Sequence, residues 1–259
     1  MVPPGLLSAM DANMVEMYRI ATLATPGGWV EKAFGVVSCG TPRGTLTTNM
    51  AMVHDATDVG HLEAATARAF VQRRQPFSIW TREHADRSLI AALEEAGFAA
   101  FTTVPAMAYH ADASPEPPTA GLTVRAVETD GDRAAFCDVM IAAWGIYGLA
   151  AETIGAFFER LEALQADDVQ GFVGWKGREP VSGAILYHCH DVAGVGWVGT
   201  VPSASRAGFG GVVTAAVVRA GLERGARFAS LQASPMGVPV YERLGFETVS
   251  HYRVFLPHA

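Results

Sequence analysis

The chain has 259 residues, of which 50% are apolar and 17% are charged, and its formal net charge is −7. This composition suits a well-filled globular core and excludes intrinsic disorder. The length favours two domains of roughly 100–150 residues each. The acidic balance argues against nucleic-acid binding through a basic surface and is compatible with a cationic amine substrate.

Cysteine content and hydropathy bear on the compartment. Cys39, Cys137 and Cys189 are widely scattered and odd in number, so we expect no disulfide framework and a reducing, cytoplasmic location. The N-terminal segment lacks the basic and apolar regions of a secretory signal. No uninterrupted run of about 20 apolar residues is present, which argues against a membrane span.

A change of composition divides the chain. Residues 112–121 are rich in proline and in small or polar residues, a pattern typical of an extended linker. We therefore expect separate lobes at residues 1–111 and 122–259.

The first lobe is expected to alternate helices and strands. Apolar spacing predicts helices at residues 12–24, 60–74 and 86–96, the last of them capped by Asp86 and ended by Gly97. Strands are expected at residues 32–40 and 45–54, joined by a turn at 41–44, and then at 77–81 and 98–109.

The second lobe is expected to contain more strands. It opens with a strand at 122–127, a helix capped by Asp130 and a second helix at 150–164. Strands at 172–176, 182–189 and 194–201 are followed by a helix at 211–224, a strand at 228–233, a helix at 238–244 and a strand at 251–256. Both lobes are thus predicted to be α/β (α+β type), each with a mixed central sheet flanked by helices.

The most informative segment is the small-residue loop after the strand that ends at Thr200. It reads Arg206-Ala207-Gly208-Phe209-Gly210-Gly211 and leads into a helix. Glycines at this point allow main-chain N–H groups and the positive end of a helix dipole to converge on one place, which favours phosphate binding. A Rossmann nucleotide site fits less well, because its glycines follow the first strand of a βαβ unit.

From Leu122 onwards the chain resembles the GNAT acyltransferases, the Gcn5-related N-acetyltransferase superfamily. The resemblance rests on Thr200-Val-Pro202, on the loop 206–211 and on Tyr241-Glu-Arg-Leu-Gly-Phe246. In that family a loop of the form Gln/Arg-x-x-Gly-x-Gly/Ala holds the pyrophosphate of acetyl-CoA. Here Ser205 occupies the first position of the motif and Arg206 follows it.

The resemblance implies a set of coenzyme-binding residues. The loop residues Arg206, Ala207, Gly208, Phe209, Gly210 and Gly211 would bind the pyrophosphate, and the main chain of Val198, Gly199 and Thr200 would bind the pantetheine arm. Ser234 stands where the family often has Asn, and its hydroxyl can still form a hydrogen bond with pantetheine. The resemblance also implies that the strand ending at Thr200 and the strand 228–233 diverge around the thioester.

Tyr241 is the expected catalytic residue. A phenol with a pKa of about 10 can give a proton or a hydrogen bond to the departing CoA thiolate. The alternative is that Tyr241 only packs beneath the turn at 244–246.

The general base is left open by the sequence. The strand before the loop contains no acidic residue, and the remaining candidates are Glu152, His188, His190 and Asp191. Direct attack by an amine deprotonated through water would need none of them. Trp144 and Tyr147 either line the acceptor site or pack in the core.

A metal site at Tyr187-His-Cys-His-Asp191 is disfavoured. On a strand, His188 and His190 share one face while Cys189 points to the other, and no paired Cys or His motif accompanies them. We therefore expect no metal, and the GNAT resemblance implies acetyl-CoA as co-substrate.

The first lobe resembles a degenerate repeat of the second. Both end with a strand, a helix that stops at Gly-Phe, and a final strand, but the loop 55–60 of the first lobe has two carboxylates that would repel a pyrophosphate. We expect a degenerate acetyltransferase-like lobe, with an unrelated small α/β domain as the alternative. The role of the first lobe would be structural: it would line one side of the acceptor cleft or form the interface of a homodimer.

The sequence therefore predicts a tandem acetyltransferase-like protein that moves an acetyl group from acetyl-CoA to a primary amine of unidentified identity, small molecule or peptide. The alternatives are a non-catalytic acyl-CoA-binding regulatory module, and an acyltransferase that uses another acyl group or a hydroxyl acceptor. No nucleic-acid or membrane partner is expected.

Overall fold

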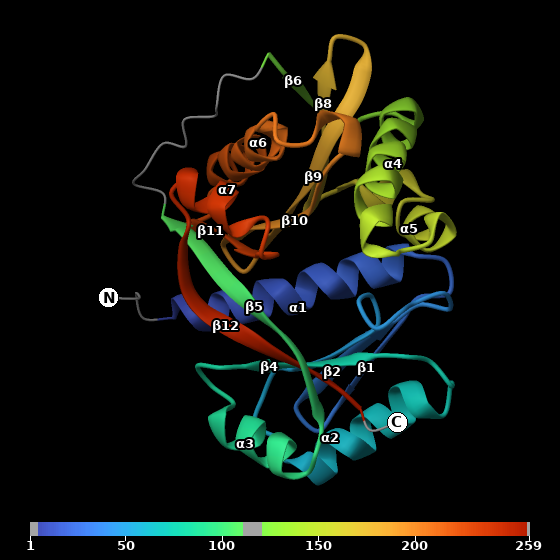
Figure 1. Cartoon of the computed structure of the whole chain (residues 1–259), viewed down its shortest axis with the longest axis vertical. Coiled ribbons are helices and arrows are strands. Elements are labelled where there is room, and N and C mark those ends of the chain that lie inside the picture. The colour runs from blue at the N-terminus through green and yellow to red at the C-terminus, as the bar shows by residue number, and fades with distance from the viewer. Residues whose placement is uncertain (1–4, 111–120, 258–259) are drawn as a thin grey trace.

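The N-terminal half alternates helices and strands in the computed structural model, which describes residues 5–110 and 121–257 (Figure 1). Its helices are α1 (Leu6–Ala24), α2 (Val59–Thr66), which continues as a π-helical turn (Ala67–Val71), and α3 (Arg87–Glu95). Its strands are β1 (Trp29–Ala33), β2 (Val36–Gly40), β3 (Met50–Val53), β4 (Ser78–Arg82) and β5 (Ala99–His110). The expected linker at 112–121 lies outside the described residues except for Gly121.

The C-terminal half has the helices α4 (Asp130–Trp144), α5 (Ala151–Phe157), α6 (Phe209–Glu223) and α7 (Val238–Arg243). Short 3₁₀ turns lie at Gly145–Tyr147, Leu161–Ala163 and Pro202–Ala204. The strands are β6 (Thr123–Ala126), β7 (Gln165–Ala166), β8 (Val169–Lys176), β9 (Glu179–Cys189), β10 (Val192–Thr200), β11 (Phe228–Gln232) and β12 (Glu247–Leu256).

Several expected boundaries were wrong because turns interrupt the apolar runs. The expected strand 32–40 is a hairpin, since Phe34 and Gly35 have φ values of 51° and 75° and reverse the chain between β1 and β2. The strand expected from residue 45 begins at Met50, because the preceding threonines form a hydrogen-bonded turn. The helix expected at 150–164 ends at Phe157.

The helix caps also differ from the expected ones. Thr129, not Asp130, caps α4: its hydroxyl accepts from the Asp132 amide at 3.2 Å, and Asp132 reciprocates in a capping box. Asp86 precedes α3 but its carboxylate caps nothing there. It accepts hydrogen bonds from Arg82 instead, and this difference matters for the site described below.

A single twelve-stranded sheet runs through both halves, in the order β1-β2-β3-β4-β12-β5-β11-β10-β9-β8-β6 with β7 paired to β8. The pairs β3–β4 and β10–β11 are parallel, and the other pairs are antiparallel. Each half thus contains a parallel pair bridged by a helix, followed by a second helix and a long final strand. The fold class predicted from the sequence is confirmed, and the repeat of topology extends over both halves.

The final strands of the two halves are exchanged. β12 of the C-terminal half lies between β4 and β5, and β5 of the N-terminal half lies between β12 and β11. Figure 1 shows both long strands passing from one half of the molecule to the other. The sequence predicted separate lobes and did not anticipate this exchange, because a strand's apolar pattern does not identify the strand with which it pairs.

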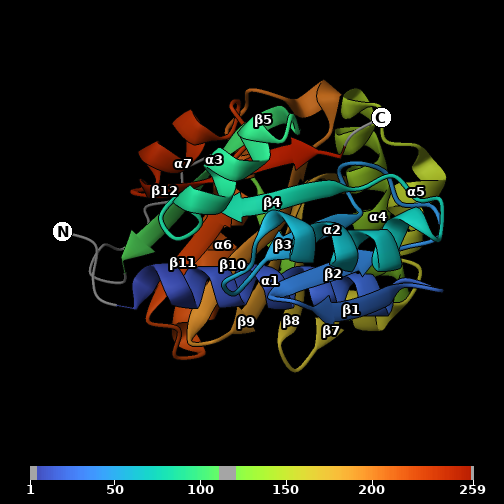
Figure 2. The ribbon, with the colours of Figure 1, turned by 90° about the horizontal axis from the view of Figure 1, so that it is seen from below.

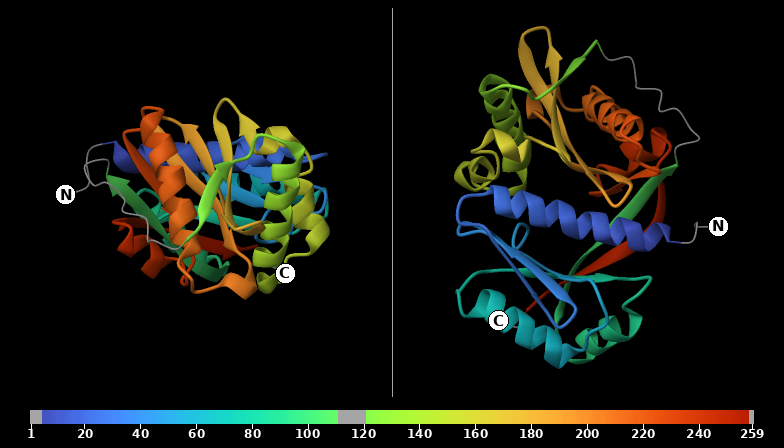
Figure 3. Two further views of the ribbon diagram at one scale, coloured as in Figure 1. Left: turned by 90° about the horizontal axis from the view of Figure 1, so that it is seen from above. Right: turned by 180° about the vertical axis from the view of Figure 1, so that it is seen from behind.

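Helix α1 lies between the two halves and contacts both. It packs on β9 and β10 of the C-terminal half and on β1 and β2 of its own half (Figure 3, right). One core cluster joins Met10, Met14 and Met17 of α1 to α4, α5 and the sheet. A second cluster lies under α6 and α7, and a third lies under α2 and α3. Figure 2 shows the helices α2 and α3 from below.

Candidate active site

The strands β10 and β11 separate where the sequence predicts the coenzyme site. They pair only over Val192–Gly194 and Phe228–Ser230, although β10 continues to Thr200. Beyond Gly194, β10 pairs with β9 alone, and a register shift falls between Gly196 and Gly199. The edge of β10 that faces β11 is therefore open at Val198–Thr200, and it suits an extended ligand that hydrogen-bonds like an added strand.

The register shift carries an unusual backbone conformation. Trp197 has a φ of 51°, which is rare for a bulky residue and indicates local strain next to the open edge. The Trp197 ring is held by surrounding aromatic rings, with centroid distances of 5.3 Å to Trp144, 5.2 Å to Phe157 and 5.0 Å to Phe158. The bulge is thus fixed by core packing.

The loop after β10 presents free main-chain donors. α6 begins at Phe209 without a side-chain cap, Gly208 has a φ of 81° and Arg206 a φ of 63°. In the described part of the chain, the amides of residues 206–210 donate to no protein acceptor. These unpaired amides at the positive end of a fifteen-residue helix are an arrangement that binds anions.

Gly210 has room for a side-chain Cβ atom. A Cβ atom at this position would lie 3.6 Å from the Thr200 hydroxyl and 3.9 Å from Val198, which are ordinary contacts. The protein's own packing therefore does not require glycine here. Glycine is explained if another molecule must approach the main chain of Gly210, and Gly211 is buried one residue further on.

The corresponding helix start of the N-terminal half is occupied by the chain's own carboxylates. Asp58 caps α2, accepting from the His61 amide at 2.8 Å, and Asp55 accepts from the Ala56 amide at 2.7 Å. An anion would meet two negative charges at this helix start instead of free amides.

Tyr241 lies in α7 on the same side of the sheet as α6. It is 9% exposed, and its ring is 5.9 Å from that of Phe246. Burial, and to a lesser degree the nearby Tyr147, raises the pKa of Tyr241. Its hydroxyl has no hydrogen-bond partner in the part of the chain that the structure describes, and it is not among the fully buried unpaired polar atoms. The phenol is thus a protonated donor that is not engaged with the protein.

Ser234 is placed by the loop between β11 and α7. Its hydroxyl accepts from the Gly237 amide at 3.2 Å, and its exposed position is two residues beyond Gln232, the last residue of β11. A Cβ atom at Gly237 would come within 2.7 Å of the Tyr241 ring. Ser234 and Tyr241 are therefore held on one short loop-and-helix unit next to the strand opening.

Trp144 and Tyr147 connect the Trp197 ring to the neighbourhood of Tyr241. Their rings lie 5.7 Å apart, in the segment between α4 and α5, and Tyr147 is 53% exposed. Trp144 packs on Trp197 in the core, whereas Tyr147 faces solvent near Tyr241. A role of these rings in lining the acceptor site stays a prediction.

The candidates for the general base do not gather at the opening. His190 and Asp191 form the turn between β9 and β10, about 20 Å or more along β10 from Val198. His188 pairs with Ala193 near that turn, and Glu152 is exposed in the first turn of α5. Among the described residues, no group of three or more His, Cys, Asp or Glu side chains is placed to hold a metal ion.

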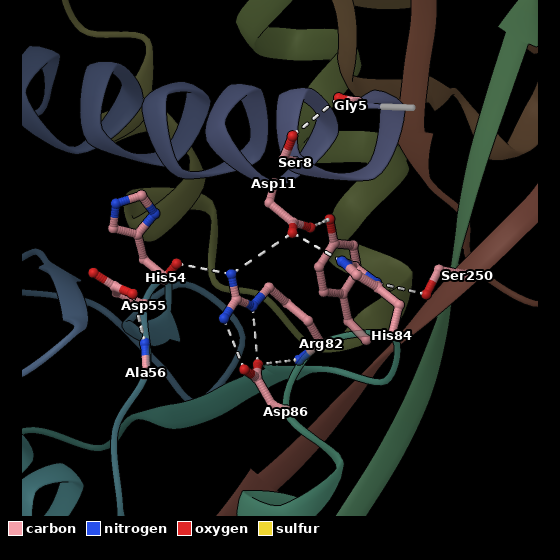
Figure 4. Close-up of polar contacts among 11 residues, drawn as sticks. Gly5, Ser8, Asp11, His54, Asp55, Ala56, Arg82, His84, Asp86 and Ser250 are labelled. Carbon is pink, nitrogen blue, oxygen red and sulfur yellow. Dashed lines mark hydrogen bonds and ion pairs between the residues drawn. The ribbon is translucent and has the colours of Figure 1, made fainter. Parts of the chain in front are cut away.

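A buried polar cluster that was not predicted from the sequence lies between α1, β4 and β12 (Figure 4). Arg82 forms a bidentate pair with Asp86, at 3.0 Å from Nε and 2.7 Å from Nη2, and also donates to the His54 carbonyl. Asp11 accepts from the Tyr252 hydroxyl at 2.8 Å and lies 3.0 Å from Nε2 of His84. These residues come from both ends of the chain, so no local motif announces them.

Residues 118–235 match the acetyltransferase (GNAT) domain family. The chain therefore carries a GNAT domain. A search of curated protein sequences found no match. No helix in the described ranges is both long and apolar enough to cross a membrane.

Solved structures have the same fold as the GNAT domain and its companion half. A GCN5-related N-acetyltransferase from Kribbella flavida aligns with a TM-score of 0.75 at 20% identity, covering 99% of this chain and 98% of its own. A GCN5-related N-acetyltransferase from Sphaerobacter thermophilus aligns at 0.59 and 17% identity, covering 87% and 78%. A tandem GNAT protein from the clavulanic acid biosynthesis pathway aligns at 0.61 and 12% identity, covering 96% and 94%.

Proposed function

We propose that this protein is an N-acetyltransferase that moves the acetyl group of acetyl-CoA to a primary amine. The observation that carries the proposal is the set of unpaired amides at residues 206–210, placed beside the open edge of β10. The match of residues 118–235 to the acetyltransferase (GNAT) domain family also supports an acetyltransferase. The free amides at the start of α6 lie at the position of the family's pyrophosphate-binding motif.

The coenzyme would lie across the opening between β10 and β11. The amides of Arg206, Ala207, Gly208, Phe209 and Gly210, with Gly211 behind them, would bind the pyrophosphate, and the Arg206 guanidinium would add positive charge in place of the motif residue replaced by Ser205. The main chain of Val198, Gly199 and Thr200 would bind pantetheine. Because the Gly199 carbonyl already accepts from Ser182 at 2.7 Å, Val198 and Thr200 would supply most of these bonds.

The chemistry needs few protein groups. The amine lone pair attacks the thioester carbonyl carbon, a C–N bond forms, and the C–S bond breaks with release of the CoA thiolate. Main-chain amides near the β10 bulge would stabilise the oxyanion, and positioning would supply much of the rate. The Tyr241 hydroxyl would give its proton to the leaving sulfur, for which its raised pKa keeps it protonated.

The N-terminal half would act without a coenzyme of its own. We propose that residues 1–111 are a degenerate acetyltransferase-like domain, joined through 112–121 to the GNAT domain at 122–259. Its α1 packs against β10, and its β5 pairs with β11, so it supports both strands of the opening. This structural work agrees with the carboxylates that occupy its helix start.

The test is titration of the protein with acetyl-CoA, followed by an assay of free CoA thiol in the presence of a panel of primary amines. We expect binding, and release of CoA that depends on the amine. Binding without release would favour the non-catalytic acyl-CoA-binding module. The lack of an acidic residue on β10 is the observation that supports this alternative. Absence of binding would refute the site itself.

A further inference from the structure

The strand exchange places residues of the N-terminal half beside the opening of the GNAT domain. Ser250 of β12 pairs with Ala106 of β5, and Ala106 pairs with Gln232 of β11. These residues form one row across the sheet, in which Ser250 and Gln232 lie about 10 Å apart. Gln232 is two residues beyond Ser230, the last residue of β11 that pairs with β10.

The side chains of this row point to the face that carries α1. Ala106 and Phe228 belong to the core cluster on that face, and strand alternation places Gln232 with Phe228. Ser250 points the same way, since it reaches His84 (Figure 4). Tyr252, two residues on and therefore on the same face of β12, reaches Asp11 of α1. Ala106 itself is buried in the core cluster, whereas Ser250 and Gln232 on either side of it are both half-buried and reach solvent.

Ser250, His84 and Asp11 form a hydrogen-bonded chain. The Ser250 hydroxyl lies 2.8 Å from Nδ1 of His84, and Nε2 of the same ring lies 3.0 Å from a carboxylate oxygen of Asp11. A carboxylate can only accept, so neutral His84 carries its proton on Nε2 and its Nδ1 accepts from Ser250. The ring is thereby fixed in the tautomer that can take a proton from the serine.

We propose that Ser250, His84 and Asp11 form the proton relay that deprotonates the acceptor amine in the transfer reaction. The inference rests on the proposed function. It supplies the general base for the acceptor amine, which β10 does not provide because it contains no acidic residue. The N-terminal half thus contributes to the chemistry as well as to the fold.

The relay moves protons only. A short chain of water molecules takes one proton from the acceptor ammonium and delivers one to the Ser250 oxygen, and Ser250 passes its hydroxyl proton to Nδ1 of His84. The lone pair left on the amine then attacks the thioester. The Asp11 carboxylate stabilises the imidazolium that results.

The polar and charged groups near His84 come from α1, β4 and β12. Asp11 faces it from α1. Arg82 of β4 lies 3.8 Å from the same Asp11 carboxylate and pairs with Asp86, the residue before α3. Tyr252 faces the same carboxylate from β12. Glu83 and His251 pair with each other on the opposite face, at 3.0 Å, and are not part of the relay.

The experiment compares acceptors that differ in their need for a base. One is the alkylamine of the panel that the wild-type protein acetylates fastest, with a pKa near that of lysine, about 10.4. The other is methoxyamine, which is already neutral at pH 7. We expect His84→Gln to lower kcat/KM for the alkylamine by about 100-fold at pH 7 while slowing methoxyamine by less than about threefold.

Further variants separate a relay from a structural role. Ser250→Ala should behave like His84→Gln, and Ser250→Thr, which keeps the hydroxyl, should restore the alkylamine rate. His251→Gln, on the opposite face of β12, should leave both rates unchanged. The wild-type alkylamine profile should show an acidic limb that His84→Gln moves to higher pH, toward the pKa of the amine itself, about 10.4. The acetyl-CoA affinity of each variant should stay at the wild-type value.

The outcomes are distinguishable. Equal slowing of both amines by His84→Gln, or an unchanged acidic limb, would overturn the relay and leave the proposed transferase standing. If the wild-type protein acetylates no amine although it binds acetyl-CoA, the proposed function fails and the relay fails with it.

Discussion

Nη1 of Arg82 lies 2.7 Å from the carbonyl oxygen of His54, so a guanidinium crosses the gap between the ends of β3 and β4. Arg82 is two residues beyond Trp80, the last residue of β4 that pairs with β3, just as Gln232 is two residues beyond Ser230 in the GNAT domain. The same topological gap is therefore closed by a side chain in one half and open in the other.

Arg82 should be important for stability. Arg82→Ala leaves the carboxylates of Asp86 and Asp11 buried without their cation, and it should lower the free energy of unfolding by about 3–5 kcal/mol. Urea denaturation measures this loss. Arg253→Ala is the matched control, since its pair with Glu94 is more exposed and should contribute about 1 kcal/mol or less. Equal losses in the two variants would show that the Arg82 cluster is no more than a surface ion pair.

Gly210→Asp should abolish acetyl-CoA binding while preserving the fold. The new carboxylate would fit beside Thr200 and Val198, but it would place negative charge and bulk where the unpaired amides converge. Isothermal titration measures the loss, which we expect to exceed about 100-fold, or about 2.7 kcal/mol. Gly60→Asp makes the same change at the start of α2 and should leave binding at the wild-type value. Unchanged binding in Gly210→Asp would show that the pyrophosphate site is elsewhere.

Local pattern predicted most of the helices and strands and the position of the glycine loop. The glycine spacing predicted the start of α6 at Phe209 to within a few residues, because a helix start is encoded by its own neighbours. The helix expected from Asp86 did form, but the carboxylate turned to Arg82 because a buried guanidinium attracts it more strongly than the exposed amides do.

Contacts between distant residues were not predictable in the same way. The Tyr252 to Asp11 hydrogen bond joins residues 241 positions apart, and it exists only because β12 crosses into the other half. Trp197 reads as an ordinary strand residue, although its φ of 51° shows that the strand is bulged. Neither the strand exchange nor the bulge at Trp197 is indicated by a local sequence pattern.

Tyr241→Phe should lower turnover more than coenzyme affinity. Loss of the hydroxyl removes the proton donor for the leaving thiolate, and we expect kcat to fall by about 10- to 100-fold with the acetyl-CoA affinity within about twofold. Tyr109→Phe is the matched control in the same core cluster, because the buried Tyr109 hydroxyl has no partner among the described residues. A Tyr241→Phe variant with wild-type kcat would assign this ring to packing alone.

Tyr252 should make the protein sensitive to alkaline pH. Burial, followed by the charge of Asp11, holds the pKa of Tyr252 well above its usual value near 10. Above about pH 10 the unfolded chain releases this proton and the folded chain keeps it, so stability falls as pH rises, by up to about 1.4 kcal/mol per pH unit. Tyr252→Phe should start less stable and lose stability less steeply, as urea unfolding between pH 8 and 11 would show. Parallel pH profiles for the two proteins would contradict this account.

The C-terminal half should not fold when expressed alone as residues 122–259. Without β5, the strands β11 and β12 lose the neighbour that pairs with both, and two unpaired edges are exposed in the middle of the sheet. Removal of α1 also uncovers β10 beside the opening, including Gly196, which lies against Met17. Gel filtration and circular dichroism should therefore report aggregation or loss of structure. Addition of residues 1–111 as a separate chain should restore a folded complex that binds acetyl-CoA, because the exchanged strands require contact between the halves and not a covalent link. A monomeric, well-folded 122–259 fragment would show that the exchange contributes little to the stability of the sheet.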